Sequence, residues 1–307
     1  MRALTLLPAI GIALSSASIA SAQSGSPPPM KVRSDRISVT VEGKGPDVIL
    51  IPGLASSREV WTGLATRLRQ SHRLHLVQVA GFAGSPAMPD PDGRVAAPTA
   101  EAIAGYIRRE RLKAPTIIGH SLGGEVALMV GARHPDRVGP LLIVDALPFY
   151  SLLINPAATS DSVKPQAAAF RNAMLMAPAT QVEAMQSASI ARLAKTEAVR
   201  PALIAAAIKS DLKTVADATY ELMTTDLRPE LGRITVPVEV IYAYDPIYGV
   251  PASNIDATFR NAYASTPHVS LKRIDGSFHF VMLDQPEAFA RAVIDFLEKR
   301  APTTINK

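Results

Sequence analysis

A serine between two glycines offers the most direct chemistry in this chain. Residues 119–123 read Gly-His-Ser-Leu-Gly, a Gly-x-Ser-x-Gly pattern. The β-branched run before it (115–118) and the apolar run after it (124–130) predict a strand, a tight turn and a helix. The glycines allow a strained turn that exposes the hydroxyl of Ser121, and the free amides and dipole of the following helix would face a nearby anion. The pattern therefore predicts a serine nucleophile.

A serine hydroxyl needs a base within hydrogen-bond reach, and the chain has 6 histidines. His279 follows the last predicted strand and precedes the final predicted helix, so we expect it to be the base. His120 lies beside Ser121 in sequence and should point away from it. His72 and His75 flank the start of a predicted strand, and His268 opens the last one. His134 lies at a predicted helix end, where capping or solvation explains it.

The base in turn needs a carboxylate that fixes its tautomer and stabilises the imidazolium. We expect this to be Asp245, at the end of the predicted strand 236–242, although an aspartate before Pro246 can also simply form a turn. Asp145, which ends the strand after Ser121, is the rival acid. Asp275 is less suitable because it is only four residues from His279 in the same loop.

An oxyanion formed at Ser121 needs two hydrogen-bond donors. One should be the backbone N–H of Leu122, the residue after the nucleophile. The other should come from the loop 52–57, where Gly53 permits an unusual backbone and Leu54 is the candidate donor.

The elements around these residues alternate between strands and helices. Buried or alternating apolar runs predict strands at 36–41, 48–51, 74–79, 116–118, 141–144, 236–242 and 269–274. Helical spacing predicts helices at 57–70, 99–110 and 286–299. The alternation predicts an α/β fold: a mostly parallel sheet with helices on both faces. It stops at 148–231, an Ala- and Met-rich helical segment that we expect to form a lid.

The amino terminus has the features of an export signal. Met1-Arg2 gives a positive start, residues 3–14 are almost wholly apolar, and Ala20-Ser21-Ala22 is a small-x-small cleavage site. We expect residues 1–22 to be a signal peptide, 23–35 a flexible leader, 36–147 with 232–300 the core, and 148–231 the lid (cap). The location would then be periplasmic or secreted, and no other stretch is apolar enough to span a membrane.

Composition excludes several classes of function. Hydrophobic residues make up 48% of the 307 residues, enough for a packed core without disulfides, since the chain has no cysteine. The net charge of +5 is scattered without a basic run, so no nucleic-acid site is expected. No histidine-rich spacing or phosphate-cradling glycine motif is present, so we expect neither a metal nor an organic cofactor.

These motifs make the chain resemble the α/β-hydrolase superfamily over about residues 36–300. The order Ser121, Asp245, His279 and the segment 277–289 are similar to its lidded members, which use a Ser-His-Asp triad on esters and, in related members, on amides, lactones or C–C bonds. Two features depart from many relatives: Pro52-Gly53 replaces His-Gly, and the turn 79–85 carries no acid. A serine nucleophile argues against dehalogenase and epoxide hydrolase chemistry, which uses a carboxylate.

The sequence thus predicts a serine esterase or lactonase for a fairly apolar small molecule, acting through an acyl-enzyme. A C–C bond hydrolase, an amidase and a cofactor-free perhydrolase remain alternatives on the same triad. A silent protein that binds a small ligand on this fold is the alternative outside catalysis. The residues do not specify the oligomeric state.

Overall fold

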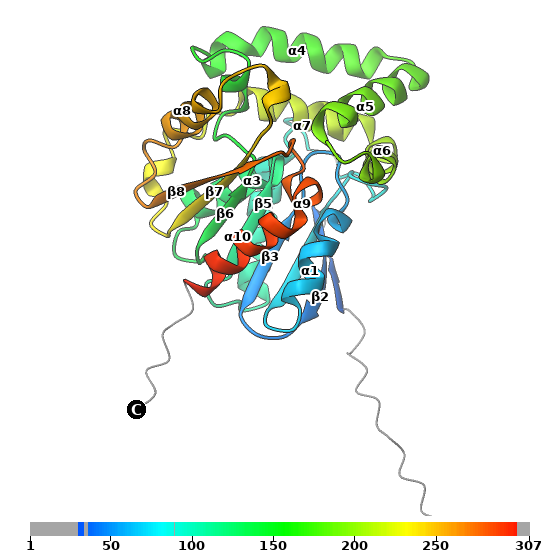
Figure 1. Cartoon of the computed structure of the whole chain (residues 1–307). Coiled ribbons are helices and arrows are strands. Elements are labelled where there is room, and N and C mark those ends of the chain that lie inside the picture. Colours follow the sequence, from blue (N-terminus) through cyan, green and yellow to red (C-terminus); the bar gives the residue numbers. More distant parts are fainter. Residues whose placement is uncertain (1–29, 34–35, 89, 300–307) are drawn as a thin grey trace, which may run out of the picture.

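The computed structural model describes residues 30–33, 36–88 and 90–299 (Figure 1). The predicted signal peptide falls outside this part of the chain. The central element of the fold is an 8-stranded sheet of order β1-β2-β4-β3-β5-β6-β7-β8 within the described residues. The strands are β1 Met30–Arg33, β2 Ile37–Gly43, β3 Asp47–Ile51, β4 Arg73–Val79, β5 Thr116–His120, β6 Leu141–Val144, β7 Val238–Tyr244 and β8 Val269–Asp275.

The sheet is parallel from β4 to β8, while β1 and β2 pair antiparallel at one edge. The carboxyl ends of β3, β5, β6, β7 and β8 therefore meet along one edge of the sheet. Ligands of open α/β sheets bind outside these strand ends. The topology confirms the predicted α/β class and directs attention to this edge.

Alternation along the strands divides the apolar side chains between two cores. In β3, Ile49 and Ile51 face one core, while Val48 and Leu50 face the other. All four are at most 1% exposed. A strand buried on both faces explains why this run is apolar without a period of two.

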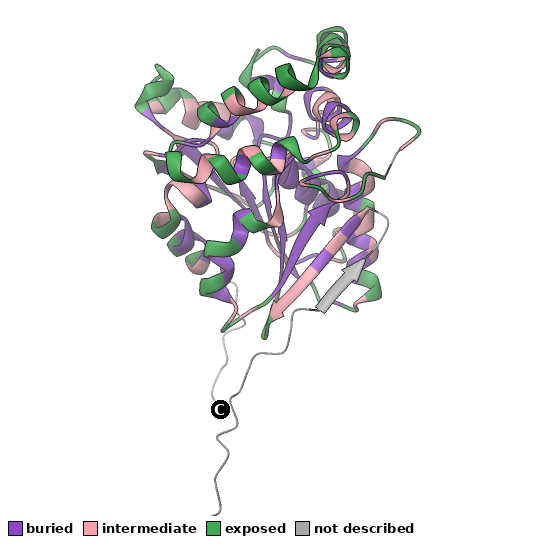
Figure 2. Ribbon diagram, turned by 90° about the vertical axis from the view of Figure 1, so that its right-hand side faces the viewer, coloured by how far each residue is buried: buried purple, intermediate pink, exposed green. Residues whose placement is uncertain are grey.

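Helices cover both faces of the sheet. The first face packs against α2 Ala96–Arg109, α3 Leu122–Arg133 and α8 Ala252–Ala262. The second packs against η1 Arg58–Trp61, α1 Thr62–Leu68, α9 Val281–Asp284 and α10 Pro286–Glu298. Figure 2 shows the resulting pattern, with buried strands inside and exposed outer helix surfaces.

Residues 148–231, here called the helical insertion, connect β6 to β7. They contain η2 Tyr150–Leu153, α4 Ser160–Met176, α5 Ala179–Leu193, η3 Glu197–Val199, α6 Arg200–Ile208, α7 Leu212–Thr224 and the start of η4 Leu231–Arg233. These helices lie above the carboxyl ends of the strands (Figure 1). The segment is helical, as its sequence predicts.

The helical insertion is attached to the core by buried contacts. The carboxylate of Glu221 in α7 accepts hydrogen bonds from the amides of Val95, Ala96 and Ala97 at 2.5, 2.7 and 2.9 Å. These amides belong to the start of α2, where a helix has free donors and a positive dipole end. The insertion is therefore held against the first face of the core by α7. The outermost helix, α4, packs on α7 and buries only Ala167 and Met174.

Three local features differ from the sequence prediction. Residues 30–33 form β1 rather than part of a flexible leader, because β2 offers an unpaired strand edge. The predicted helix 57–70 divides into η1 and α1. Helix α8 follows β7 where no element was predicted, and its buried face is formed by Phe259 and Ala262. Among the described residues, no helix combines the length and apolarity needed to cross a membrane.

Candidate active site

Ser121 occupies a sharp turn between β5 and α3. Its φ of 54° lies in the left-handed region, and its amide donates to the carbonyl of Val144 at 2.9 Å. A Cβ at Gly119 would overlap the backbone of Gly123, and one at Gly123 would overlap the carbonyl of Ile51. The turn therefore needs glycine at both motif positions. It places Ser121 at the carboxyl edge of the sheet, as the sequence predicts.

The base predicted from sequence, His279, follows β8 and faces an aspartate. Its Nδ1 lies 2.6 Å from Oδ2 of Asp145, the residue that ends β6. The other oxygen of that carboxylate accepts from the amide of Ala243 at 2.9 Å, which fixes its orientation. The acid that contacts His279 is thus Asp145, and the prediction of Asp245 for this position is wrong.

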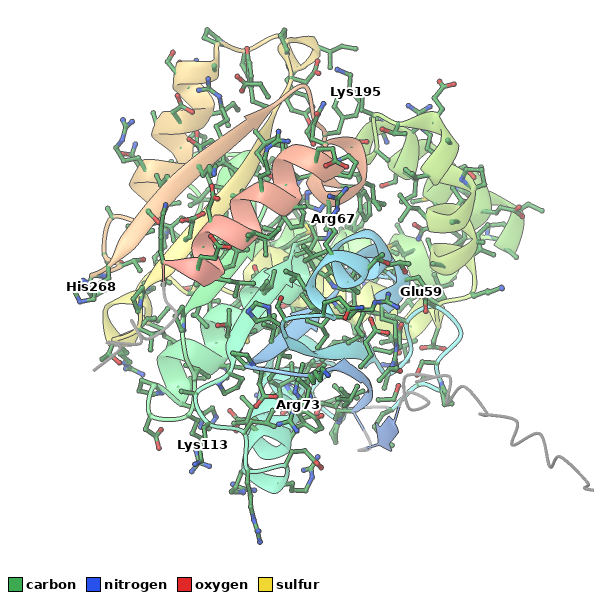
Figure 3. All side chains as sticks on the ribbon, turned by 60° about the horizontal axis from the view of Figure 1, so that its bottom comes forward. Glu59, Arg67, Arg73, Lys113, Lys195 and His268 are labelled. Atoms are coloured by element: carbon green, nitrogen blue, oxygen red, sulfur yellow. The ribbon has the colours of Figure 1, made fainter. Side chains whose placement is uncertain are left out.

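Asp245 is occupied by a different partner. Its Oδ2 accepts from Nζ of Lys195 at 2.6 Å, and its Oδ1 accepts from the amide of Ile247 at 3.0 Å. The hydrogen bond from Lys195, with that from the Ile247 amide, lowers the pKa of the Asp245 carboxyl. Lys195 follows α5 in the helical insertion and is labelled in Figure 3. Asp245 therefore caps η5 (Pro246–Tyr248) and ties β7 to the insertion.

The loop that carries His279 is held from several sides. The amide of Phe278 donates to Asp284 at 2.9 Å, and the amide of Phe280 donates to the carbonyl of Leu193 at 3.1 Å. The same Asp284 carboxylate accepts from the amides of Lys195 and Thr196 at 3.0 and 2.8 Å. Backbone groups on both sides of His279 are therefore connected to the end of α5.

No hydrogen bond joins the Ser121 hydroxyl to the His279 ring among the described residues. Such contacts are often long without substrate and tighten when it binds. Ser121 and Asp145 nevertheless end adjacent parallel strands, since His120 pairs with Val144 in the register of β5 and β6. The three side chains thus belong to one edge of the sheet.

The two predicted oxyanion donors have free amides. Neither Leu54 nor Leu122 donates a backbone hydrogen bond to another described residue. Leu122 is the first residue of α3, so its amide is one of the donors that a helix leaves unpaired. A Cβ on Gly53, beside Leu54, would lie 3.0 Å from Cβ of Ser121. The loop 52–57 therefore passes directly against Ser121.

Three of the six described non-glycine residues with positive φ belong to this site. Ser121, Asp145 and Ala55 all have positive φ, at 54°, 46° and 53°. Non-glycine residues adopt this region at a cost, and such residues gather where function requires a particular side-chain direction. The strain affects Ser121, Asp145 and the loop of the candidate oxyanion donor.

Aromatic and apolar side chains lie beside the base. The ring of Tyr248 in η5 packs on Phe278 with centroids 5.5 Å apart. Burial and the neighbouring carboxylates of Asp145, Asp245 and Asp284 raise the pKa of the Tyr248 hydroxyl. Its neighbours Ile247 and Val250 are exposed, at 74% and 38%. We call Ile247, Tyr248, Val250 and Phe278 the apolar rim.

His120 lies at the site although sequence reasoning did not select it as a site residue. Its ring is buried and contacts the ring of His279, with centroids 4.5 Å apart. One feature of the sequence points to His120. It is a polar residue at the end of a strand that is covered on both faces, so its ring must find a hydrogen-bond partner on a neighbouring element.

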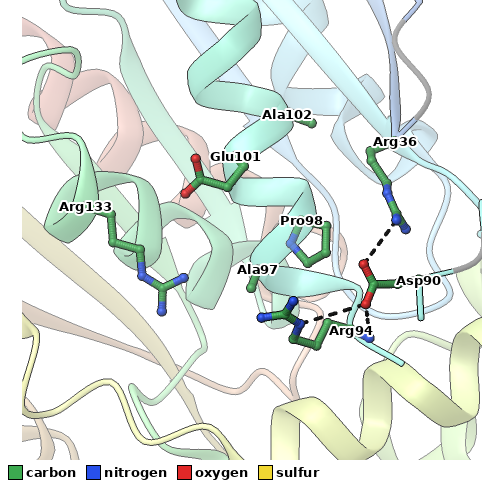
Figure 4. Close-up of a pocket in the computed structure, with 8 residues that line it drawn as sticks. All are labelled: Arg36, Asp90, Arg94, Ala97, Pro98, Glu101, Ala102 and Arg133. Carbon is green, nitrogen blue, oxygen red and sulfur yellow. Dashed lines mark hydrogen bonds and ion pairs between the residues drawn. The ribbon is translucent and has the colours of Figure 1, made fainter. Parts of the chain in front are cut away.

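A separate cavity of about 610 Å³ lies away from these residues, between β2 and the start of α2. Figure 4 shows its arginines: Arg36 and Arg94 contact Asp90, and Arg133 lies on the opposite side. Arg133 forms a bidentate pair with Glu230. Each guanidinium already faces a carboxylate, so this cavity offers no free cationic group to an anion. Within the described ranges, no cluster of three or more His, Asp or Glu side chains could hold a metal ion.

Comparison with known proteins agrees with this architecture. Residues 48–292 match the family model described as "Alpha/beta hydrolase family". A pimeloyl-[acyl-carrier protein] methyl ester esterase from Aeromonas salmonicida is 30% identical over 271 residues, which cover 85% of this chain and 100% of that protein. The enzyme of the same name from Yersinia enterocolitica is 26% identical, covering 82% and 93%.

Solved structures show the same fold. The enol-lactonase from Burkholderia xenovorans LB400 superposes with a TM-score of 0.70 at 18% identity, covering 85% of this chain and 96% of that one. A thermophilic esterase from Thermogutta terrifontis gives a TM-score of 0.70 at 19% identity, covering 88% and 98%. The chain belongs to the alpha/beta hydrolase family.

Proposed function

We propose that this protein hydrolyses a carboxylic ester or lactone of a fairly apolar small molecule through an acyl-enzyme, with Ser121, His279 and Asp145 as its triad. The chain is an α/β-hydrolase, and ester hydrolysis is the class of its activity. The main observation that supports this triad is the 2.6 Å contact between Nδ1 of His279 and Oδ2 of Asp145, at the same sheet edge as the Ser121 turn. The curated relatives support an ester substrate, since their names describe methyl ester esterases.

In the proposed mechanism, Ser121 attacks the ester carbonyl while Nε2 of His279 accepts its proton. Asp145 holds Nδ1–H and stabilises the imidazolium that forms. The amides of Leu122 and Leu54 donate to the oxyanion, and each such donor is typically worth roughly 10²–10³ in rate. His279 then protonates the leaving alcohol, and a water activated by the same ring releases the acid.

The apolar rim supports a substrate with an apolar portion. Ile247, Tyr248 and Val250 follow β7, and Tyr248 packs on Phe278, the residue before the base. Asp245 and Lys195 form an ion pair at this point, and the nearby carboxylates of Asp145 and Asp284 already accept hydrogen bonds from His279 and from backbone amides. A charged acyl or alcohol group would lose water there without gaining a free partner, whereas an alkyl group would gain contact area.

We further propose that the chain is exported and cleaved after Ala22, so that the mature enzyme acts in the periplasm or outside the cell. The support is the positive start, the apolar run 3–14 and the small-residue site 20–22. N-terminal sequencing of the protein recovered from a periplasmic fraction tests this. Recovery of an intact Met1 start in the cytoplasm would contradict it.

The activity is tested with p-nitrophenyl esters from acetate to laurate, together with a methyl ester panel. The wild type should turn over, with an optimum at an intermediate or long acyl chain, and Ser121→Ala should lose activity by several orders of magnitude. Labelling by a fluorophosphonate probe checks the nucleophile independently. A folded wild type that neither turns over esters nor takes the label would refute the proposed function.

A further inference from the structure

We propose that His120, the residue before the nucleophile, is a positioning residue that holds the base His279 in place through the backbone of its loop. This proposal rests on the proposed function, since it assigns His120 a role in the same site. It concerns a side chain that takes no part in the reaction steps described above.

The main contact is a hydrogen bond to the backbone of the base. Nε2 of His120 donates to the carbonyl oxygen of His279 at 3.0 Å. The amide groups on either side are already engaged, since Phe278 donates to Asp284 and Phe280 donates to Leu193. Among the described residues, His120 therefore supplies the hydrogen bond that joins this loop to β5, the strand that leads to Ser121.

The His120 ring also fills the space between the base and the oxyanion loop. It is 1% exposed and lies 4.5 Å from the ring of His279 and 5.0 Å from the ring of Phe280, between centroids. On its other side, a Cβ on Gly53 would come within 3.0 Å of Nδ1. A single ring thus separates the base from the loop that carries the candidate donor Leu54, and its size sets their spacing.

Burial favours the neutral form of the His120 ring, in which only one nitrogen carries a hydrogen. Complete burial, with the charge that His279 acquires nearby, lowers the pKa of His120 well below the ordinary histidine value. Its Nδ1 has no hydrogen-bond partner among the described residues. A neutral ring with one N–H must carry it on Nε2 to satisfy the His279 carbonyl. The hydrogen bond therefore does not require a charged His120 ring.

The hydrogen bond from His120 supports a loop that crosses one strand of the sheet. His279 follows β8, yet its acid follows β6, two strands away in the sheet order. The loop must pass over the end of β7 to bring Nδ1 to Asp145. The hydrogen bond from His120, at the end of β5, to the carbonyl of His279 favours the position in which the loop crosses β7. The buried His120 ring also keeps the loop from moving toward Gly53.

The test compares His120→Phe with His120→Gln. Phenylalanine fills the space but has no N–H, whereas glutamine keeps an amide donor of similar reach. We expect His120→Phe to lower kcat and kcat/KM by similar factors, roughly 10-fold to 100-fold, with KM nearly unchanged, because small displacements of a catalytic group cost rate rather than binding. His120→Gln should recover most of this loss. The fluorophosphonate labelling rate should follow the same order, and the Tm of both variants should show that they fold.

A readout without turnover separates this proposal from the proposed function. In protein labelled with ¹⁵N-histidine, the imidazole signals of His120 should show the Nε2–H tautomer. The proton between His279 Nδ1 and Asp145 should be visible in the wild type and His120→Gln, and should broaden or vanish in His120→Phe. An Nδ1–H tautomer, or a His120→Phe variant with wild-type rate and an unchanged Nδ1 proton, would overturn the proposal. Equal losses in both variants that follow lost Tm would also overturn it, because they indicate packing alone.

Discussion

The assignment of the acid can be tested by the pair Asp145→Asn and Asp245→Asn. In the wild type, one oxygen of Asp145 accepts from the amide of Ala243 and the other faces Nδ1 of His279. An asparagine must keep its carbonyl oxygen toward Ala243, because its NH₂ cannot accept that hydrogen bond. The NH₂ then faces Nδ1 and forces the proton of the neutral ring onto Nε2. His279 would donate toward Ser121 rather than accept its proton.

This wrong tautomer removes the base while leaving the fold and the oxyanion donors intact. We expect kcat of Asp145→Asn to fall by roughly 10⁴-fold, the loss typical of such a substitution in a Ser-His-Asp triad, or about 5 kcal/mol in the activation free energy. Substrate binding should change little, so KM should stay close to the wild-type value.

Asp245→Asn is the matched control. Asparagine can still cap η5 through its carbonyl oxygen, which accepts from the amide of Ile247 in the wild type. The variant loses only the ion pair with Lys195, whose side chain is 47% exposed. A pair with one half-exposed partner contributes at most about 1 kcal/mol. A free energy of that size corresponds to about fivefold in rate, so we expect activity within about fivefold of the wild type. The steady-state kinetics of p-nitrophenyl ester hydrolysis measure both variants. A near-normal Asp145→Asn with an inactive Asp245→Asn would refute the reasoning.

Three further predictions concern the supports of the site. Glu125 in α3 is buried with no hydrogen-bond partner for either oxygen, and burial followed by the nearby charge of Glu221 raises the pKa of its carboxyl well above the usual range. Above the ordinary glutamate pKa the unfolded chain therefore loses a proton that the folded chain keeps, so stability falls as pH rises, by up to about 1.4 kcal/mol per pH unit for this group. Urea unfolding should show the advantage of Glu125→Gln over the wild type growing between pH 5 and 8; a constant difference would contradict this. Gly123→Ala should lower the free energy of unfolding by more than about 3 kcal/mol, because its Cβ would meet the backbone of Ile51. Urea unfolding followed by circular dichroism measures this loss, and wild-type stability would argue against the strained turn. Asp284→Ala should lower kcat by roughly 10-fold, since the loop of His279 loses an anchor; wild-type kcat in a folded variant would show that the anchor is not needed.

Much of the site could be predicted from local sequence. The Ser121 turn depends on residues within one strand-turn-helix unit, and the glycines that it needs lie two positions away on either side. His279 could be found because it follows the last strand, whose apolar run is recognisable. The buried run 48–51 and the helical insertion were also predicted, since both follow from periodicity and composition.

The tertiary structure alone decided which aspartate contacts His279. Both candidates end parallel strands at the same edge, and β7, which leads to Asp245, is the direct neighbour of β8. Proximity in the strand order thus favours the wrong residue. Two contacts between distant segments reverse the choice: Lys195 of the helical insertion occupies Asp245, and the loop of the base crosses β7 to reach Asp145.

The orientation of the His120 ring was likewise decided by the tertiary structure. Its burial and its place beside Ser121 can be read from the chain, but its hydrogen bond is to a residue 159 positions away. Sequence determined the fold class, the turn at Ser121 and the position of His279 after the last strand, because each depends on short-range periodicity and backbone sterics. Tertiary structure determined the pairing of charges and the crossing of the base loop, because these depend on which side chains meet when the strands assemble and the insertion packs over their ends.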